Sequence, residues 1–113
     1  WHAPSDDEWQ ILVDYLGGEE IAGGKLKDTQ DWDSPNTGAN NESGFSALPG
    51  GKRGGHYLDE GIYIGINKFA YFWSTKGVIS SSAVFLTLKY NSESIDSQSN
   101  KKAQGSSVRC LKD

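Results

Sequence analysis

The fold is decided between residues 4 and 18, which read Pro-Ser-Asp-Asp-Glu-Trp-Gln-Ile-Leu-Val-Asp-Tyr-Leu-Gly-Gly. Ser5 followed by Glu8 is the pattern of a capping box, in which the two residues satisfy each other's backbone N–H groups at a helix start. Behind it, apolar residues recur at the spacing of one helix face, at Trp9, Leu12, Val13 and Leu16. Two glycines then supply the left-handed stop. We therefore predict a helix that begins after Ser5 and packs this apolar face into the core.

A second helix is predicted from Glu19 to Leu26, although Gly23 and Gly24 weaken it by about 1 kcal/mol each relative to alanine. Downstream, β patterns predict strands at residues 45–48, 62–66, 70–75, 83–90, 94–99 and 106–112. Alternation within 83–90 predicts one buried and one solvated face. Because the helices come first and antiparallel strands later, the class is α+β, with one or two N-terminal helices packed on a twisted antiparallel sheet in a loop-rich fold.

Composition limits the classes of function. The 113 residues are of a length for one domain, and the net charge is −4 with scattered basic residues. A basic patch for nucleic acid is therefore missing, and no stretch approaches the roughly 20 apolar residues of a membrane span. An aromatic-rich, Gly/Ser/Asn-rich chain with one cysteine and no methionine favours an extracellular or periplasmic location, although a single cysteine fits the cytosol equally well. We expect a monomer.

Catalytic patterns are scarce. His2 and His56 are the only histidines, and neither has a nucleophile and an orienting carboxylate at a spacing that indicates a triad. One cysteine and two histidines cannot form a four-ligand structural zinc site, and no HExxH motif is present. We expect no catalytic residues and no resident cofactor.

The polar segment from Asp28 to Gly44 is rich in oxygen donors. These are Asp28, Asp31, Asp33, Asn36, Asn40, Asn41 and Glu42. Ca²⁺ takes six to eight oxygen ligands, which makes calcium the alternative for this loop. The spacing does not match an EF-hand, and solvated turns held by Asx side chains are the favoured interpretation.

Aromatic residues divide between core and surface. The predicted core comprises Trp9, Leu12, Val13, Leu16, Trp32, Phe45, Trp73, Leu86 and Val108. Tyr57 lies in a Gly-rich loop where no strand buries it, so a role as a ligand platform is as well supported there as a structural one.

Several ordered motifs resemble the Fibrobacter succinogenes major paralogous domain. They are Trp1-His2-Ala3-Pro4-Ser5-Asp6 with Glu8-Trp9, Leu16-Gly17-Gly18, Ala22-Gly23-Gly24-Lys25-Leu26-Lys27, Ser34 to Phe45, Ala47-Leu48-Pro49-Gly50-Gly51 with Arg53, Trp73-Ser74-Thr75, and Gly105 with Ser107-Val108-Arg109-Cys110. The resemblance covers nearly the whole chain. More distantly, the layout resembles the C-type-lectin-like fold of sulfatase-modifying enzymes, which implies adjacent termini and a final strand that returns to the N-terminus.

The resemblance also carries an expectation for Cys110. In the family a Cys-Pro-x-Gly segment commonly precedes the Trp-His motif, which implies that residues 1–113 are an N-terminally trimmed fragment of a larger secreted or surface protein. Cys110 would then be the disulfide partner of that upstream cysteine and a shielded free thiol here. A small buried hydrophobic role is the alternative. The oxidase chemistry of the sulfatase-modifying relatives needs a cysteine pair, so it is not implied.

These observations favour a non-catalytic extracellular binding or display module. Its ligand, a glycan or a protein, would meet the Gly/Tyr-rich loops at His56, Tyr57, Asp59, Glu60 and Tyr63. A structural or assembly domain without a specific ligand is the alternative, and an enzyme is the least favoured class.

Overall fold

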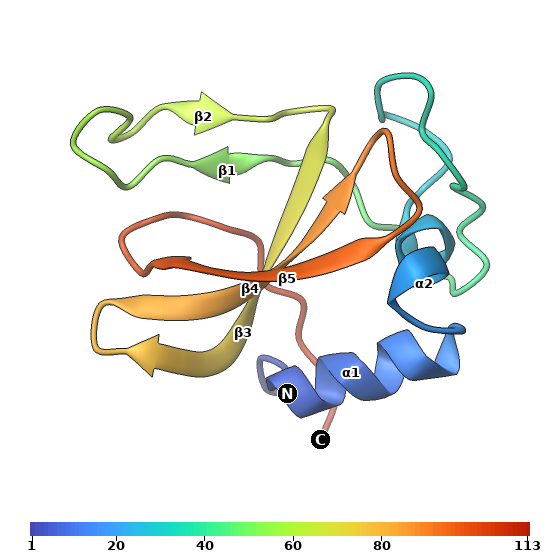
Figure 1. Cartoon of the computed structure of the whole chain (residues 1–113), viewed down its shortest axis with the longest axis horizontal. Coiled ribbons are helices and arrows are strands. Elements are labelled where there is room, and N and C mark those ends of the chain that lie inside the picture. Colours follow the sequence, from blue (N-terminus) through green and yellow to red (C-terminus); the bar gives the residue numbers. More distant parts are fainter.

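The computed structural model describes residues 1–77 and 79–113 in full. Two helices come first, α1 at Asp6–Tyr15 and α2 at Glu19–Leu26. The strands follow, with β1 at Lys52–Arg53, β2 at Tyr63–Ile64, β3 at Phe69–Ile79, β4 at Ser82–Lys89 and β5 at Ile95–Lys101. β3, β4 and β5 form one antiparallel sheet in that order, and β1 pairs separately with β2 (Figure 1). The predicted α+β class is confirmed.

Helix α1 begins as its capping box predicts. The Ser5 hydroxyl accepts a hydrogen bond from the Glu8 backbone N–H at 3.3 Å, and the Glu8 carboxylate accepts one from the Ser5 N–H at 2.8 Å. The predicted apolar face is also confirmed, since Trp9 and Val13 of this helix are buried in the core. Gly17, with φ of 106°, then turns the chain away in the left-handed region.

Helix α2 has its predicted bounds, and its two glycines have a packing role. A Cβ atom on Gly23 would lie 2.2 Å from the carbonyl oxygen of Ser94, and one on Gly24 would lie 2.4 Å from that of Gly38. The backbone of α2 therefore approaches two other backbone segments more closely than any side chain would allow. The two glycines that lower the helix propensity of α2 are therefore the residues that allow this close packing.

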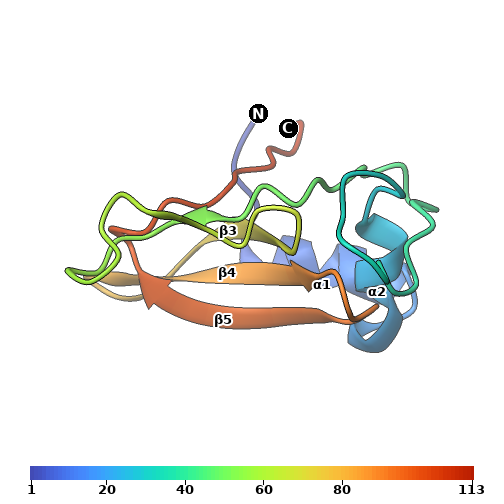
Figure 2. The same cartoon turned by 90° about the horizontal axis from the view of Figure 1, so that it is seen from above.

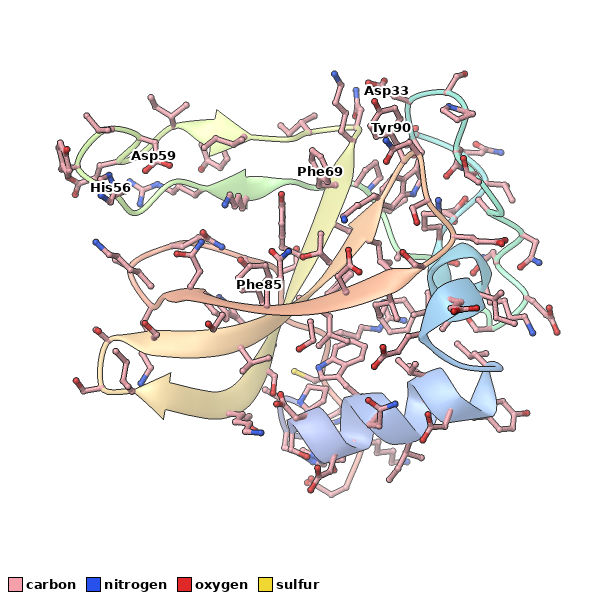
Figure 3. The ribbon with its side chains drawn as sticks, viewed as in Figure 1. Asp33, His56, Asp59, Phe69, Phe85 and Tyr90 are labelled. Atoms are coloured by element: carbon pink, nitrogen blue, oxygen red, sulfur yellow. The ribbon has the colours of Figure 1, made fainter. Side chains whose placement is uncertain are left out.

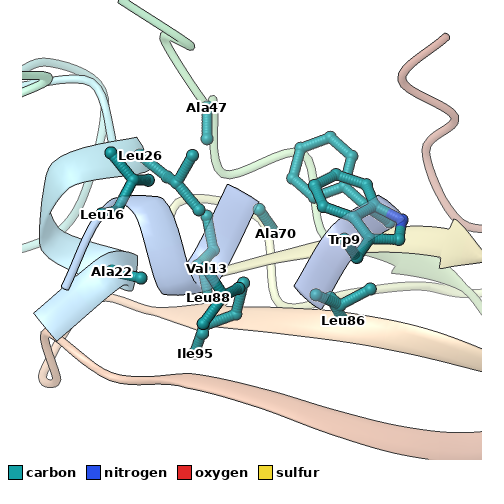
Figure 4. Close-up of a cluster of buried hydrophobic side chains, with 11 residues drawn as sticks. Trp9, Val13, Leu16, Ala22, Leu26, Ala47, Ala70, Leu86, Leu88 and Ile95 are labelled. Carbon is teal, nitrogen blue, oxygen red and sulfur yellow. The ribbon is translucent and has the colours of Figure 1, made fainter. Parts of the chain in front are cut away.

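The core lies between the helices and the inner face of the β3–β4–β5 sheet (Figure 4). It comprises Trp9, Val13, Leu16, Ala22, Leu26, Ala47, Ala70, Phe72, Leu86, Leu88 and Ile95, with Leu12, Trp32 and Phe45 partly buried against it. Two core predictions need correction. Trp73 is half-buried and packs edge-on against Phe85 outside this cluster. Val108 is 55% exposed because its segment lies at the surface.

Strand β4 is buried on both faces, so the predicted solvated face is wrong. Residues 83–88 are all buried. On the face away from the helices, Phe85 packs edge-on against Tyr71, and the Lys52 ammonium of β1 lies 5.2 Å from the centre of the Tyr71 ring. The β1–β2 pair and its neighbours thus cover the face that alternation alone assigns to solvent.

Other strands differ in extent from their predictions. Residues 45–48 form no strand, since only Ala47 pairs with Lys27 and Ser46 has a positive φ of 54°. The stretch predicted at 62–66 shortens to β2, whereas the one predicted at 70–75 lengthens to β3. The last segment, 106–112, makes only single-residue bridges, at Ser107 and Leu111.

The two ends of the chain meet, as expected. The His2 N–H donates to the Leu111 carbonyl at 2.9 Å, and the Leu111 N–H donates to the His2 carbonyl at 2.8 Å. Figure 2 shows both termini side by side on one face of the molecule. Neither helix in the described residues has the length and apolar character that crossing a bilayer requires.

Candidate functional site

Four of the predicted ligand-binding residues lie on the connection between β1 and β2, residues 54–62, which we call the hairpin tip. Asp59 closes it, because its carboxylate accepts a hydrogen bond from the His56 N–H at 2.8 Å (Figure 3). The rings of His56 and Tyr57 lie 4.2 Å apart, and Tyr57 is 81% exposed. Glu60 is exposed on the same turn. The tip therefore presents an aromatic and an acidic side chain to solvent, whereas Asp59 holds its shape.

A small cavity of about 90 Å³ separates the hairpin tip from the turn that follows β5. The Lys52 ammonium donates to the Gln104 amide oxygen at 3.1 Å, and the Asn100 amide donates to the same oxygen at 2.9 Å. These bonds fix the wall of the cavity on the β5 side. Its lining includes Lys52, His56, Asp59, Asn100, Lys101 and Gln104.

Tyr63 does not belong to the hairpin tip but to an open groove beside β1, which we call the Tyr63 groove. Tyr63 is the cross-strand partner of Arg53, so both side chains emerge on one face of the β1–β2 pair. On its other edge, the Arg53 backbone exchanges two hydrogen bonds with Gly105, at 2.8 and 2.9 Å. The groove has a volume of about 280 Å³ and is lined by Gly50, Gly51, Lys52, Arg53, Tyr63, Gly105, Ser106 and Ser107.

The Tyr63 groove has free binding groups. Tyr63 is 69% exposed, and within the described residues no carboxylate lies at salt-bridge distance from Arg53. A guanidinium offers five N–H donors in a fixed fork, and a tyrosine ring offers an apolar face with a polar end. The groove can therefore bind a ligand that has both apolar faces and hydrogen-bonding groups.

In the polar loop, Asp28, Asn36 and Asn41, three of the predicted calcium ligands, make hydrogen bonds within the loop or with Ser46 just after it. One Asp28 carboxylate oxygen accepts a hydrogen bond from the Gln30 N–H at 3.1 Å, and the Asp28 carbonyl accepts one from the Asn36 amide at 3.2 Å. Asn41 and Ser46 exchange hydrogen bonds at 2.8 and 2.9 Å. The bond from Gln30 to Asp28 is that of an Asx turn, and the others join residues farther apart.

The remaining carboxylates of that loop do not converge. Glu42 approaches the Lys25 ammonium at 3.7 Å, and Asp31 is exposed. Asp33 lies at the end of the molecule away from His56 and Asp59 (Figure 3). Across the part of the chain that the structure describes, no three His, Cys, Asp or Glu side chains gather as metal ligands would. Calcium as a ligand of this loop stays the alternative prediction, beside the favoured interpretation of solvated turns.

Lys27 is a buried cation that sequence reasoning missed. Its side chain is fully buried at the end of α2. The ammonium donates to the carbonyl oxygens of Thr37 and Lys89 at 2.8 Å and of Ser92 at 2.9 Å, and it lies 5.4 Å from the centre of the Trp32 ring. Burial lowers the pKa of Lys27 to about 8. This side chain joins the end of α2 to Thr37 of the polar loop, to the last residue of β4 and to the turn after β4. No local signal in the sequence marks a lysine for that position.

A second groove, which we call the α1 groove, runs between α1 and the C-terminal segment. It has a volume of about 420 Å³ and is lined by Pro4, Glu8, Trp9, Ile11, Leu12, Tyr15, Phe45, Arg109 and Leu111. The guanidinium carbon of Arg109 lies 4.5 Å from the centre of the Phe45 ring. The indole N–H of Trp9 is buried and has no hydrogen-bond acceptor in the described residues. Most of the lining is apolar.

A charged cluster joins the chain ends beside this groove. His2 Nδ1 lies 2.8 Å from Asp113 and His2 Nε2 lies 2.7 Å from Glu8. These hydrogen bonds, first to Asp113 and then to Glu8, raise the pKa of His2. The terminal ammonium of Trp1 also donates to Asp113, at 2.6 Å. His2 thus links the start of α1 to the C-terminal end and has no role in the hairpin tip.

Cys110 is a free thiol, but it is exposed, so the expected shielding is wrong. The segment around it is held to the rest of the molecule by the single-residue bridges at Ser107 and Leu111 and lies at the surface. Its pairing with a cysteine upstream of Trp1 stays a prediction.

Comparison with known proteins gives one result that covers nearly the whole chain. The model of the Fibrobacter succinogenes major domain matches residues 1–112. No curated protein and no solved structure matches the chain. The chain belongs to the Fibrobacter succinogenes major domain family.

Proposed function

We propose that this domain is a non-catalytic binding module of an extracellular or cell-surface protein, and that its ligand is a saccharide held in the Tyr63 groove. The observation that carries the proposal is the exposed cross-strand pair of Arg53 and Tyr63 above that groove. The lectin-like arrangement expected from the sequence is part of the same proposal.

The chemistry of the groove suits a saccharide. A sugar ring has apolar C–H faces, which pack on an aromatic side chain, and hydroxyl groups, which need donors and acceptors around the rim. Tyr63 offers the aromatic face, and the Arg53 guanidinium offers free donors. Gly50, Gly51 and Gly105 carry no side chains that would fill the groove, so backbone polar groups border it.

The state of the two histidines supports a function without catalysis. Both ring nitrogens of His2 are bonded to carboxylates, and neither is free to activate a nucleophile. The His56 ring lies beside the Tyr57 ring, and its Nδ1 accepts from the Leu58 N–H at 3.4 Å. Within the described residues, no serine or cysteine side chain is hydrogen-bonded to either imidazole.

The hairpin tip would extend this surface. Tyr57 is exposed on the connection between β1 and β2, the pair that carries Tyr63, so a longer saccharide could contact it beyond the groove. We expect Tyr57 to contribute less than Tyr63, because Tyr57 lies outside the lining of the Tyr63 groove. A protein ligand at this surface is the competing outcome.

The test is an oligosaccharide array probed with the wild-type domain and three variants. Tyr63→Ala and Arg53→Gln remove the groups that carry the proposal, and Tyr15→Ala is the matched control, since Tyr15 is an exposed tyrosine on α1. Saturable binding that the first two variants lose and the control keeps would support the proposal. A blank array for the folded wild-type domain would favour a structural or assembly role.

A further inference from the structure

The α1 groove is an apolar surface that the proposed function does not use. Ile11 is 69% exposed and Tyr15 is 85% exposed, although both lie on a helix whose opposite face forms the core. Together with Leu12, Phe45 and Leu111 they line a groove of about 420 Å³. Pockets that bind small molecules are of this size and are lined mainly by apolar and aromatic side chains.

Of the two charged residues that line the groove, Glu8 is fully hydrogen-bonded and Arg109 has no ion-pair partner among the described residues. Glu8 has both carboxylate oxygens bonded, one to His2 Nε2 at 2.7 Å and the other to the Ser5 N–H at 2.8 Å. Arg109 has no carboxylate at salt-bridge distance in the described residues. Since Arg109 lies over the Phe45 ring at 4.5 Å, its guanidinium is held at the wall of the groove.

We propose that the α1 groove binds a small amphipathic carboxylate, with its apolar chain along α1 and its carboxylate on Arg109. The apolar chain would cover Ile11, Leu12 and Tyr15, which removes exposed apolar surface from water. The carboxylate would accept two parallel hydrogen bonds from the guanidinium fork, the geometry in which arginine binds carboxylates.

The charges around the groove select against other head groups. A cationic amphiphile would meet Arg109 without a free carboxylate to pair with, because Asp113 and Glu8 are both bonded to His2. A neutral amphiphile would gain the apolar contacts but not the charge-assisted hydrogen bonds. A carboxylate head group is therefore the one that gains most from Arg109. This site is independent of any saccharide in the Tyr63 groove.

The test is calorimetric titration of the folded domain with three probes that share one tail, octanoate, octanol and octylamine. We expect saturable binding of octanoate about tenfold tighter than that of octanol, the difference expected for a charge-assisted hydrogen bond to carboxylate, and weaker binding of octylamine. Arg109→Gln should weaken octanoate to the level of octanol, whereas Arg53→Gln, which changes the net charge equally, should leave octanoate binding unchanged.

Amide chemical shifts of the wild-type domain provide a second measurement that needs no variant. Octanoate should shift the resonances of residues 8–15 and 109–111 at the groove. The proposal is overturned if octanoate does not bind, if octanol binds equally well, or if the shifts map to another surface. Loss of octanoate binding with intact saccharide binding in Arg109→Gln would separate this site from the Tyr63 groove.

Discussion

The ammonium of Lys27 and the carbonyl oxygen of Lys89 lie 2.8 Å apart, which ties the end of α2 to the end of β4. The same ammonium bonds the carbonyls of Thr37 and Ser92. Thr37 and Ser92 lie in loops, where no ladder pairs their carbonyls, whereas Lys89 is the last residue of β4. One buried side chain therefore supplies the hydrogen-bond donor for carbonyls of two loops and of the end of a strand.

Replacing Lys27 should test this role directly. Lys27→Met keeps much of the buried volume but leaves three carbonyl oxygens without their donor. Each unsatisfied buried group costs about 1 to 3 kcal/mol, so the free energy of unfolding should fall by about 3 kcal/mol or more. Urea denaturation measures it. Lys112→Met, at an exposed lysine, should change stability by less than about 0.5 kcal/mol, and an equal effect of the two changes would contradict the account.

Gly23→Ala should destabilise the domain although alanine is the better helix former. Intrinsic propensity favours alanine by about 1 kcal/mol. The added Cβ would lie 2.2 Å from the Ser94 carbonyl oxygen, which forces α2 away from the residues before β5. We expect a lower melting temperature by differential scanning calorimetry. An increase would show that the close approach of α2 to Ser94 is not required.

Trp9→Ala should cost about 3 to 5 kcal/mol, because a buried indole at the centre of the helix–sheet contact would be replaced by a cavity. Trp9→Phe should cost clearly less, since it also removes a buried N–H that has no acceptor. Chemical denaturation of both variants gives the comparison. Ile11→Ala, on the exposed face of the same helix, is the control, and a loss as large as that of Trp9→Ala would contradict the assignment of faces.

The N-terminal half of the architecture could be predicted because its signals are local. A capping box, an apolar face at helical spacing and a glycine stop all act within a few residues, and α1 begins where they indicate. The bounds of α2 were also predicted, but the role of Gly23 was not. Its close contact is with Ser94, which lies far along the chain.

The sheet and the candidate site depend on contacts that a single sequence does not show. Side chains in β4 do alternate between the two faces of the sheet, but the β1–β2 pair covers the face predicted to be solvated. Residues 83–88 are therefore all buried. Val108 reads as a strand residue, yet its segment pairs only at separate residues. Arg53 and Arg109 appear in the family motifs, and only the structure places each beside an open groove.

The cluster at the chain ends should make stability depend on pH in a defined window. The folded-state pKa of His2 is raised above 6.5, first by Asp113 and then by Glu8, so its contribution is complete below pH 6.5 and is lost as pH rises through the raised value. The pKa values of Glu8 and Asp113 are lowered below 4.5 and 3.8, so their contribution is lost as pH falls through those lowered values. The cluster is therefore complete between about pH 4.5 and 6.5.

His2→Asn isolates this effect. The difference in unfolding free energy between wild type and variant should be largest between about pH 5 and 6 and should shrink on both sides. Denaturation curves across the pH range, in one buffer system at constant ionic strength, measure it. A difference that keeps growing above pH 7 would be inconsistent with a protonated His2 between two carboxylates.

The central claim is that the exposed pair of Arg53 and Tyr63 forms a binding surface. The most direct measurement is the affinity of the folded domain and of Tyr63→Ala for the best oligosaccharide found on an array, with Tyr15→Ala as the control. We predict saturable binding that Tyr63→Ala weakens about tenfold or more and that Tyr15→Ala retains. Unchanged affinity in Tyr63→Ala, or no binding by a folded wild-type domain, would contradict the claim.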